Sequence, residues 1–246
     1  MSKPLENRIA LVTGATRGIG YATALALAKE GAHIVATGRT VGGLEELDDA
    51  IKAAGGTATL VPADIRDFDG IARLARALDE RYGKLDILIG NAGVTGPSSP
   101  LDHVPPKDWD EVIAVNVTAN WQLIRHMDPL LKRSDAGRVV FLTSNAPARA
   151  AAYRGPYAIT KGALEILART YAAETASTPI RVNLFAPGHT RTRMRAAVAS
   201  GEDPMTLPPP EAVVTAIVPL CRPDFQETGK LYDYRAGRLK SFRAPD

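Results

Sequence analysis

A tyrosine and a lysine four residues apart carry the strongest chemical signal in this 246-residue sequence. Tyr157 and Lys161 lie in a stretch of helical spacing that runs to about Ala176, so their side chains fall one turn apart on the same helix face. A phenol ionises near pH ~10, and a nearby positive charge lowers its pKa by stabilising the phenolate. The pair therefore predicts a tyrosine that exchanges protons near neutral pH. A solvated helix face would show the same spacing, so the interpretation depends on the rest of the chain.

A glycine-rich turn near the start of the chain predicts a site for a phosphate group. Residues 9–13 indicate a buried strand, and a helical pattern follows over 21–30. The glycines between them, Gly14, Gly18 and Gly20, permit a tight turn and a close approach of the backbone to a pyrophosphate at the positive end of the helix. A further strand over 32–37 completes a strand–helix–strand unit of about thirty residues, which is typical of a dinucleotide site. A plain strand-to-helix turn is the alternative.

The end of the second strand indicates which dinucleotide binds. An acidic residue at this place accepts hydrogen bonds from the ribose of NAD and repels the extra phosphate of NADP, but this chain has Gly38-Arg39-Thr40 there. Arg39 can pair with a 2′-phosphate, and Arg17 in the glycine turn can add a second guanidinium. The sequence thus favours NADP(H) over NAD(H), with two solvated arginines as the alternative. Asp64, after the third strand, is placed either to accept from the adenine amino group or to cap the next helix.

Strand-like and helix-like stretches alternate over the whole length of the chain. Beyond the first unit, strands are predicted over 57–62, 85–89, 138–143, 180–186 and 231–234. Helices are predicted over 44–54, 68–82, 108–132 with a break near Asn116, 157–176 and 211–220. This alternation predicts an α/β fold, a single-domain doubly wound Rossmann fold with a parallel sheet of about seven strands and helices on both faces. The irregular segment 189–210 is a candidate substrate lid, because long loops in compact domains are often functional.

Composition argues against several other classes of protein. The net charge is +3 and the charges are interspersed, so neither a nucleic-acid tail nor a membrane-surface patch is expected. The first apolar run ends at Thr13-Gly14, too soon for a secretion signal or a membrane span, and we expect a cytoplasmic protein. The single cysteine excludes an internal disulfide, and the four histidines lack metal-ligand spacing, so no metal site is predicted.

Six motifs, in order and with close to the usual gaps, resemble the short-chain dehydrogenase/reductase family. They are Thr13-Gly14-x-x-x-Gly18-x-Gly20, Asn91-Ala92-Gly93, Asn116, Ser144, Tyr157-x-x-x-Lys161 and Pro187-Gly188-x-x-x-Thr192. The match spans about residues 6–235. The stretches 155–162 and 228–234 also resemble YciK-like reductases, a likeness that names no substrate.

The resemblance implies catalytic roles for four residues. Tyr157 would protonate the carbonyl oxygen in reduction, or act as the base in oxidation. Lys161 would hold the nicotinamide ribose and lower the pKa of Tyr157. Ser144 would hydrogen-bond the substrate oxygen, and Asn116 would break its helix and anchor a water in a proton relay from Lys161 to solvent.

The resemblance also implies a cofactor site built from distant parts of the chain. The glycine turn would hold phosphate, Asn91-Ala92-Gly93 would pack beside the cofactor, and the segment after Pro187 would seat the nicotinamide amide and the diphosphate. The expected cofactor-binding residues are Tyr157 and Lys161 together with Gly14, Thr16, Arg17, Gly18, Ile19, Gly20, Arg39, Asp64, Asn91, Ala92, Gly93, Pro187, Gly188, Thr190 and Thr192. Thr190 departs from the family, which usually has Ile or Val there. The polar C-terminal strand departs as well, and weakens the expectation of a tetramer that uses it.

The sequence therefore predicts an NADP(H)-dependent oxidoreductase that interconverts a carbonyl and a secondary alcohol. A 3-oxoacyl thioester reductase and a non-catalytic NADP-binding sensor or scaffold are the alternatives, although a sensor would not need the proton-transfer residues. The lid arginines Arg191, Arg193 and Arg195 indicate either recognition of an acidic substrate group or a solvated basic loop. The helical stretches 108–132 and 155–176 resemble those through which the family assembles, which predicts a homodimer or homotetramer. The small-molecule substrate itself is not identified.

Overall fold

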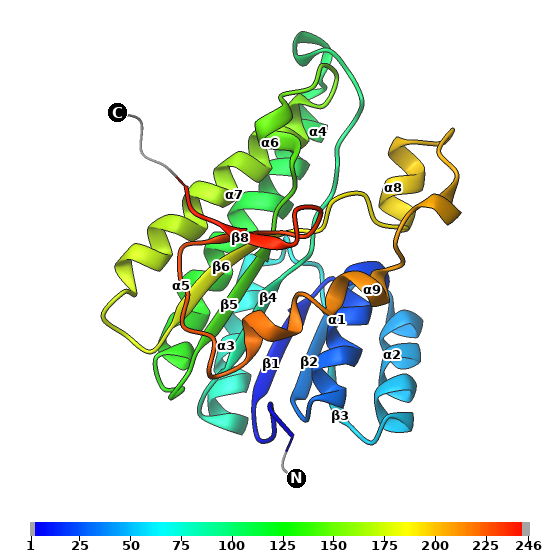
Figure 1. The fold of residues 1–246 in the computed structure, drawn as a ribbon. Coiled ribbons are helices and arrows are strands. Elements are labelled where there is room, and N and C mark those ends of the chain that lie inside the picture. The colour runs from blue at the N-terminus through cyan, green and yellow to red at the C-terminus, as the bar shows by residue number, and fades with distance from the viewer. Residues whose placement is uncertain (1–2, 243–246) are drawn as a thin grey trace.

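A single sheet of eight strands runs through the computed structural model, which describes residues 3–242 (Figure 1). The strand order is β3-β2-β1-β4-β5-β6-β7-β8, and every neighbouring pair is parallel except β7 with β8. The predicted α/β Rossmann fold is thus confirmed, with one strand more than expected. No helix within residues 3–242 combines the length and apolar character that a membrane span requires.

The strands are short and mostly buried. They are β1 (Ile9–Thr13), β2 (His33–Gly38), β3 (Thr57–Pro62), β4 (Ile87–Gly90), β5 (Arg138–Leu142), β6 (Arg181–Ala186), β7 (Leu231–Asp233) and β8 (Arg238–Lys240). The helices are α1 (Gly18–Lys29), α2 (Val41–Ala53), α3 (Phe68–Tyr82), α4 (Pro106–Ile113), α5 (Ala119–Leu131), α6 (Ala146–Arg149), α7 (Gly155–Glu174), α8 (Arg193–Val198) and α9 (Pro210–Val214). Single 3₁₀ turns lie at Leu101–His103, Pro204–Thr206 and Val218–Cys221, and a π-helical segment lies at Ala114–Thr118.

Two apolar cores lie on the two faces of the sheet. Helices α1, α2 and α9 cover one face, and α3, α5 and α7 cover the other (Figure 1). Adjacent residues of β1 divide between the cores, because successive strand side chains point to opposite faces: Val12 packs with the first group of helices and Leu11 with the second. Both faces of the central strands are buried, and their sequences are therefore continuous runs of mostly apolar residues.

Proline accounts for the main difference between predicted and observed helices. The helix expected over 211–220 is instead the short α9 and a 3₁₀ turn at Val218–Cys221. Pro219 lies in the first turn of that 3₁₀ element and cannot donate the hydrogen bond that a continuous α-helix needs there. The break expected near Asn116 is confirmed as the π-helical segment.

The carboxylate of Asp86 ties the amino ends of several strands together. It is fully buried and accepts hydrogen bonds from the backbone N–H of Ile9 at 2.9 Å and from Ser134 Oγ at 2.6 Å. It also pairs with Arg8 Nη1 at 3.1 Å and with Lys84 Nζ at 3.0 Å. One buried anion thus connects β1, β4 and the segment before β5 at the amino ends of these central strands, opposite the glycine turn.

Candidate active site

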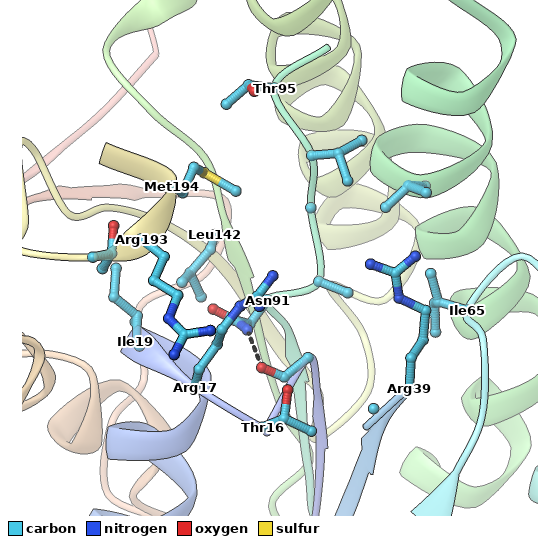
Figure 2. A pocket seen from close by; sticks show the side chains of 18 of the residues that line it. Thr16, Arg17, Ile19, Arg39, Ile65, Asn91, Thr95, Leu142, Arg193 and Met194 are labelled. Carbon is cyan, nitrogen blue, oxygen red and sulfur yellow. Dashed lines mark hydrogen bonds between the residues drawn. The ribbon is translucent and has the colours of Figure 1, made fainter. Parts of the chain in front are cut away.

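The glycine turn after β1 packs directly against the loop after β4. Gly14 adopts a φ of 64°, in the left-handed region that favours glycine. Asn91 Nδ2 donates to Thr13 O at 2.8 Å. It also donates to Gly14 O at 3.1 Å, the bond that is dashed in Figure 2. A Cβ added to Gly20 would lie 2.3 Å from Gly14 O and 2.4 Å from Asn91 Nδ2. Any larger residue at position 20 would therefore push the turn and the loop apart.

A cavity of about 700 Å³ opens at the carboxyl ends of β1, β2 and β4. This is where the strand order reverses, the place at which open α/β sheets bind ligands. Most of the expected cofactor residues line it. They are Gly14, Thr16, Arg17, Gly18, Ile19, Arg39, Asp64, Asn91, Ala92, Gly93, Tyr157, Lys161, Pro187 and Thr192.

Three expected cofactor residues do not line this cavity. Gly20 lies behind the turn, against Asn91. Gly188, with φ of 70°, is covered by the side chain of Arg235. Thr190 is buried, and its hydroxyl lies 3.4 Å from Pro187 O. Their contacts with a cofactor stay predictions.

Guanidinium groups give the cavity a positive charge. Figure 2 shows Arg17 and Arg193 on one side and Arg39 on the other, beside Ile65. Arg191 and Lys161 also line it, whereas Asp64 is the one acidic residue among the described residues around it. The cavity is thus suited to a ligand with several negative charges.

Asp64 does not cap the helix that follows it. Its carboxylate is held by Arg66, with Nη2 at 2.6 Å, and accepts the Arg66 backbone N–H at 2.9 Å. The side-chain hydrogen bond from Arg66 lowers the pKa of Asp64, and the charge of Arg39 contributes to the same effect. Asp67 caps α3 instead, accepting the N–H of Gly70. Of the two roles predicted for Asp64, the helix cap is therefore excluded. Asp64 lines the cavity, and its contact with the adenine amino group stays a prediction.

The proton-transfer residues meet where β5 ends and α7 begins. Tyr157 is in the first turn of α7, and the Lys161 ammonium lies over its ring, 5.8 Å from the centroid. Lys161 is 4% exposed and its Nζ donates to Leu142 O at 2.7 Å. Ser144, just after β5, accepts the Ala146 N–H at 3.1 Å through its hydroxyl and also lowers the pKa of the phenol. The helix spacing and the strand end thus bring the predicted groups together.

Burial, rather than the lysine charge, controls the pKa of the tyrosine. Desolvation raises the pKa of Tyr157, and the Ser144 hydrogen bond only partly opposes it. Burial likewise lowers the pKa of Lys161 to about 8. Lys161 is not among the groups that shift the pKa of the phenol in this structure, so the lowering expected from the lysine is not seen.

Asn116 holds the loop after β4 to α7. Its Oδ1 accepts from Val94 N at 2.9 Å, and its Nδ2 donates to Val94 O and to Thr160 Oγ1, each at 2.9 Å. The residue is fully buried within the π-helical segment. It fixes the residue next to Lys161 in sequence, and the proton relay through a water stays a prediction.

The three lid arginines have three different environments. Arg195 pairs with Glu202 through two hydrogen bonds, one of 2.8 Å. Arg191 lies at the cavity with Nη1 3.0 Å from Met205 Sδ, and Arg193 faces the cavity from the start of α8. A common role for the three in recognising a substrate anion is not supported by this arrangement.

The sequence interpretation overlooked one pair of residues beside Lys161. Thr143 Oγ1 donates to Glu165 Oε1 at 2.8 Å. Glu165 follows Lys161 by four residues, the same spacing that singled out Tyr157 and Lys161. That spacing was a usable signal, but the contact to Thr143 depends on how β5 packs against α7.

Comparisons with known proteins agree with this geometry. Residues 8–203 match the model of the short chain dehydrogenase family. The oxidoreductase YciK of Escherichia coli (strain K12) is 34% identical over 95% of this chain and 94% of its own length. A short chain dehydrogenase from Shigella flexneri 2a, complexed with NADP, has 32% identity and a TM-score of 0.89 over 96% of this chain and 100% of its own. One from Escherichia coli CFT073, complexed with NADPH, has 33% identity and a TM-score of 0.88 over 95% and 98%. On its sequence and its fold, the chain belongs to the short-chain dehydrogenase family.

Proposed function

We propose that this protein is an NADP(H)-dependent oxidoreductase that interconverts a carbonyl and a secondary alcohol, with Tyr157 as general acid and base. The observation that carries the proposal is that Tyr157 and Lys161 lie together at an arginine-lined cavity, with Ser144 close enough to the phenol to affect its pKa. A protein that only bound a nucleotide would not need this set of groups.

The residues around the cavity fit NADP(H). Gly14 and Gly18 of the turn line the cavity, where the free N–H groups at the start of α1 can hold a diphosphate. Arg39 and Arg17 offer guanidinium groups for the 2′-phosphate, and two structural relatives of this chain were crystallised with NADP and NADPH. When bound, the nicotinamide supplies or accepts the hydride at the substrate carbon.

The protein's own side chains would transfer the proton and orient the substrate and the cofactor. Tyr157 donates a proton to the carbonyl oxygen in reduction and accepts one from the alcohol in oxidation. Its raised pKa keeps the phenol protonated near neutral pH, which is the state that reduction needs. Ser144 orients the substrate oxygen. Lys161, with a pKa of about 8, carries its charge near neutral pH and holds the ribose.

A panel of carbonyl compounds, followed by the absorbance of the reduced nicotinamide, tests the reaction class. We expect NADPH to be consumed with at least one ketone or aldehyde. NADPH binding with no consumption across acyl thioesters, steroids, sugars and small ketones would support a non-catalytic NADP-binding sensor instead.

Replacing Arg39 with Asp tests the choice of dinucleotide. We expect the Kd for NADPH to rise by about 10- to 100-fold, because a hydrogen bond to a charged group contributes roughly 1.5–3 kcal/mol and the new carboxylate would repel the 2′-phosphate. The Kd for NADH should change far less. Fluorescence titration with both nucleotides measures this, and Arg76→Asp is the matched control, since Arg76 is exposed on α3 away from the cavity. An unchanged ratio of the two Kd values would mean that the 2′-phosphate is recognised elsewhere.

We also propose that the protein assembles as a homo-oligomer through α5 and α7. Trp121 on α5 is 44% exposed and Ile166 on α7 is 58% exposed, and large apolar side chains on neighbouring helices favour association. Size-exclusion chromatography with light scattering should give the mass of a dimer or tetramer. A monomer at all accessible concentrations would contradict the proposal.

A further inference from the structure

Two consecutive residues at the end of β5 hold two residues of α7 that are one helical turn apart. Leu142 O accepts from Lys161 Nζ at 2.7 Å. Thr143 Oγ1 donates to Glu165 Oε1 at 2.8 Å. The next residue is Ser144, which acts on the phenol of the proposed catalytic tyrosine. The strand end therefore fixes the lysine, the glutamate and the serine relative to one another.

The position of Glu165 is set by a buried donor. Thr143 is 2% exposed, and its hydroxyl donates a hydrogen bond to the Glu165 carboxylate. Glu165 is itself partly buried. Burial raises its pKa, while the Thr143 hydrogen bond and the charges of Arg169 and Lys161 oppose that rise. The carboxylate thus accepts a desolvation cost that a freely solvated surface glutamate would not have.

Burial makes the charged form of Lys161 sensitive to nearby charges. It is 4% exposed, and burial penalises the ammonium form. Glu165 is the one charged group among the described residues whose field raises the pKa of Lys161. Arg169, one turn further along α7, acts on Glu165 and lies over the ring of Phe242. Removing the Glu165 charge would therefore let Lys161 lose its proton at lower pH.

We propose that Glu165, held by the Thr143 hydroxyl one helical turn from Lys161, is a positioning residue whose charge keeps Lys161 protonated where it binds the nicotinamide ribose. The inference rests on the function proposed above, in which Lys161 binds the cofactor. Glu165 touches neither substrate nor cofactor in this account and acts only through Lys161. Its effect is confined to pH values at which Lys161 can lose its proton.

The variant Glu165→Gln tests this role, because it keeps an oxygen that can accept from Thr143 and removes only the charge. NADPH binding is measured by fluorescence at about pH 6.5 and about pH 9 for wild type and variant. We expect equal affinities at the lower pH and an affinity about three- to tenfold weaker than wild type at the higher pH, since one pKa unit corresponds to a tenfold change in an equilibrium constant. Glu174→Gln is the matched control, with the same chemical change at the exposed end of α7, and should follow wild type at both pH values.

Two results would overturn the inference and leave the proposed function intact. One is a Glu165→Gln titration that matches wild type at both pH values. The other is an equal loss at both, which indicates a structural role only. Thr143→Val, which keeps the charge but removes the orienting donor, should show a smaller loss confined to high pH, and it replaces Glu165→Gln if that variant does not fold. Wild-type protein that binds no NADPH at either pH would overturn the proposed function itself.

Discussion

Replacing Tyr157 with Phe is expected to lower the turnover of a carbonyl substrate by about 10²–10⁴-fold, the usual contribution of a positioned general acid. The substitution removes only the hydroxyl, so the ring keeps its place in the first turn of α7 and under the Lys161 ammonium. NADPH affinity should therefore stay within a few-fold of wild type. Steady-state turnover and fluorescence titration on the same preparation separate the two effects.

The matched control for this loss is Tyr21→Phe. Tyr21 is on α1 outside the described cavity lining, and its hydroxyl lies 3.5 Å from Glu46 O. This control should keep wild-type turnover. Tyr157→Phe with wild-type turnover would show that another group supplies the proton.

Replacing Asp86 with Ala is expected to lower the free energy of unfolding by about 3–5 kcal/mol, the cost of breaking a buried ion pair from one side. The buried carboxylate accepts from Ile9 N and Ser134 Oγ and pairs with Arg8 and Lys84. Removing it leaves the Ile9 N–H without its acceptor, and a buried unsatisfied donor is costly. Equilibrium denaturation by urea at neutral pH measures the change.

Asp135→Ala provides the comparison, because Asp135 pairs with the same Arg8 but its side chain is 72% exposed. An exposed ion pair contributes about 0–1 kcal/mol, so this variant should lose less than about 1 kcal/mol. Equal losses for the two variants would show that the burial of Asp86 does not set its contribution.

Local signals predicted the elements that carry their own start and stop residues. The helix α3 matched its predicted range 68–82 because Asp67 caps its start and Gly83, with φ of 68°, ends it. The strand β3 matched its predicted range 57–62 because it is preceded by a glycine turn and followed by residues of the cavity loop. In both elements the residues that mark the start or the end lie next to the element in the sequence, although β3 forms by pairing with β2.

Short elements without an apolar pattern were not predictable. The strand β8 is short, partly exposed and polar, and it exists by pairing with β7 across a turn at Gly237. No apolar pattern marks it in the sequence. The helix α6 is a single turn after Asn145, and its sequence of small residues resembles a loop.

The candidate site shows the same division. The spacing of Tyr157 and Lys161 was readable because it lies within one helix. The pKa of the phenol could not be predicted from the sequence, because it depends on how deeply Tyr157 is buried in the fold. The different environments of the lid arginines also could not be predicted from the sequence. Only the structure shows that Arg195 pairs with Glu202 and that Arg193 lies at the cavity.

Parallel fluorescence titrations of the purified protein with NADPH and NADH measure the proposed preference for NADP(H). The positive cavity with Arg39 at the end of β2 predicts saturable binding of both nucleotides, with a lower Kd for NADPH. Tighter binding of NADH, or no binding of either nucleotide, would rule out an NADP(H)-dependent function.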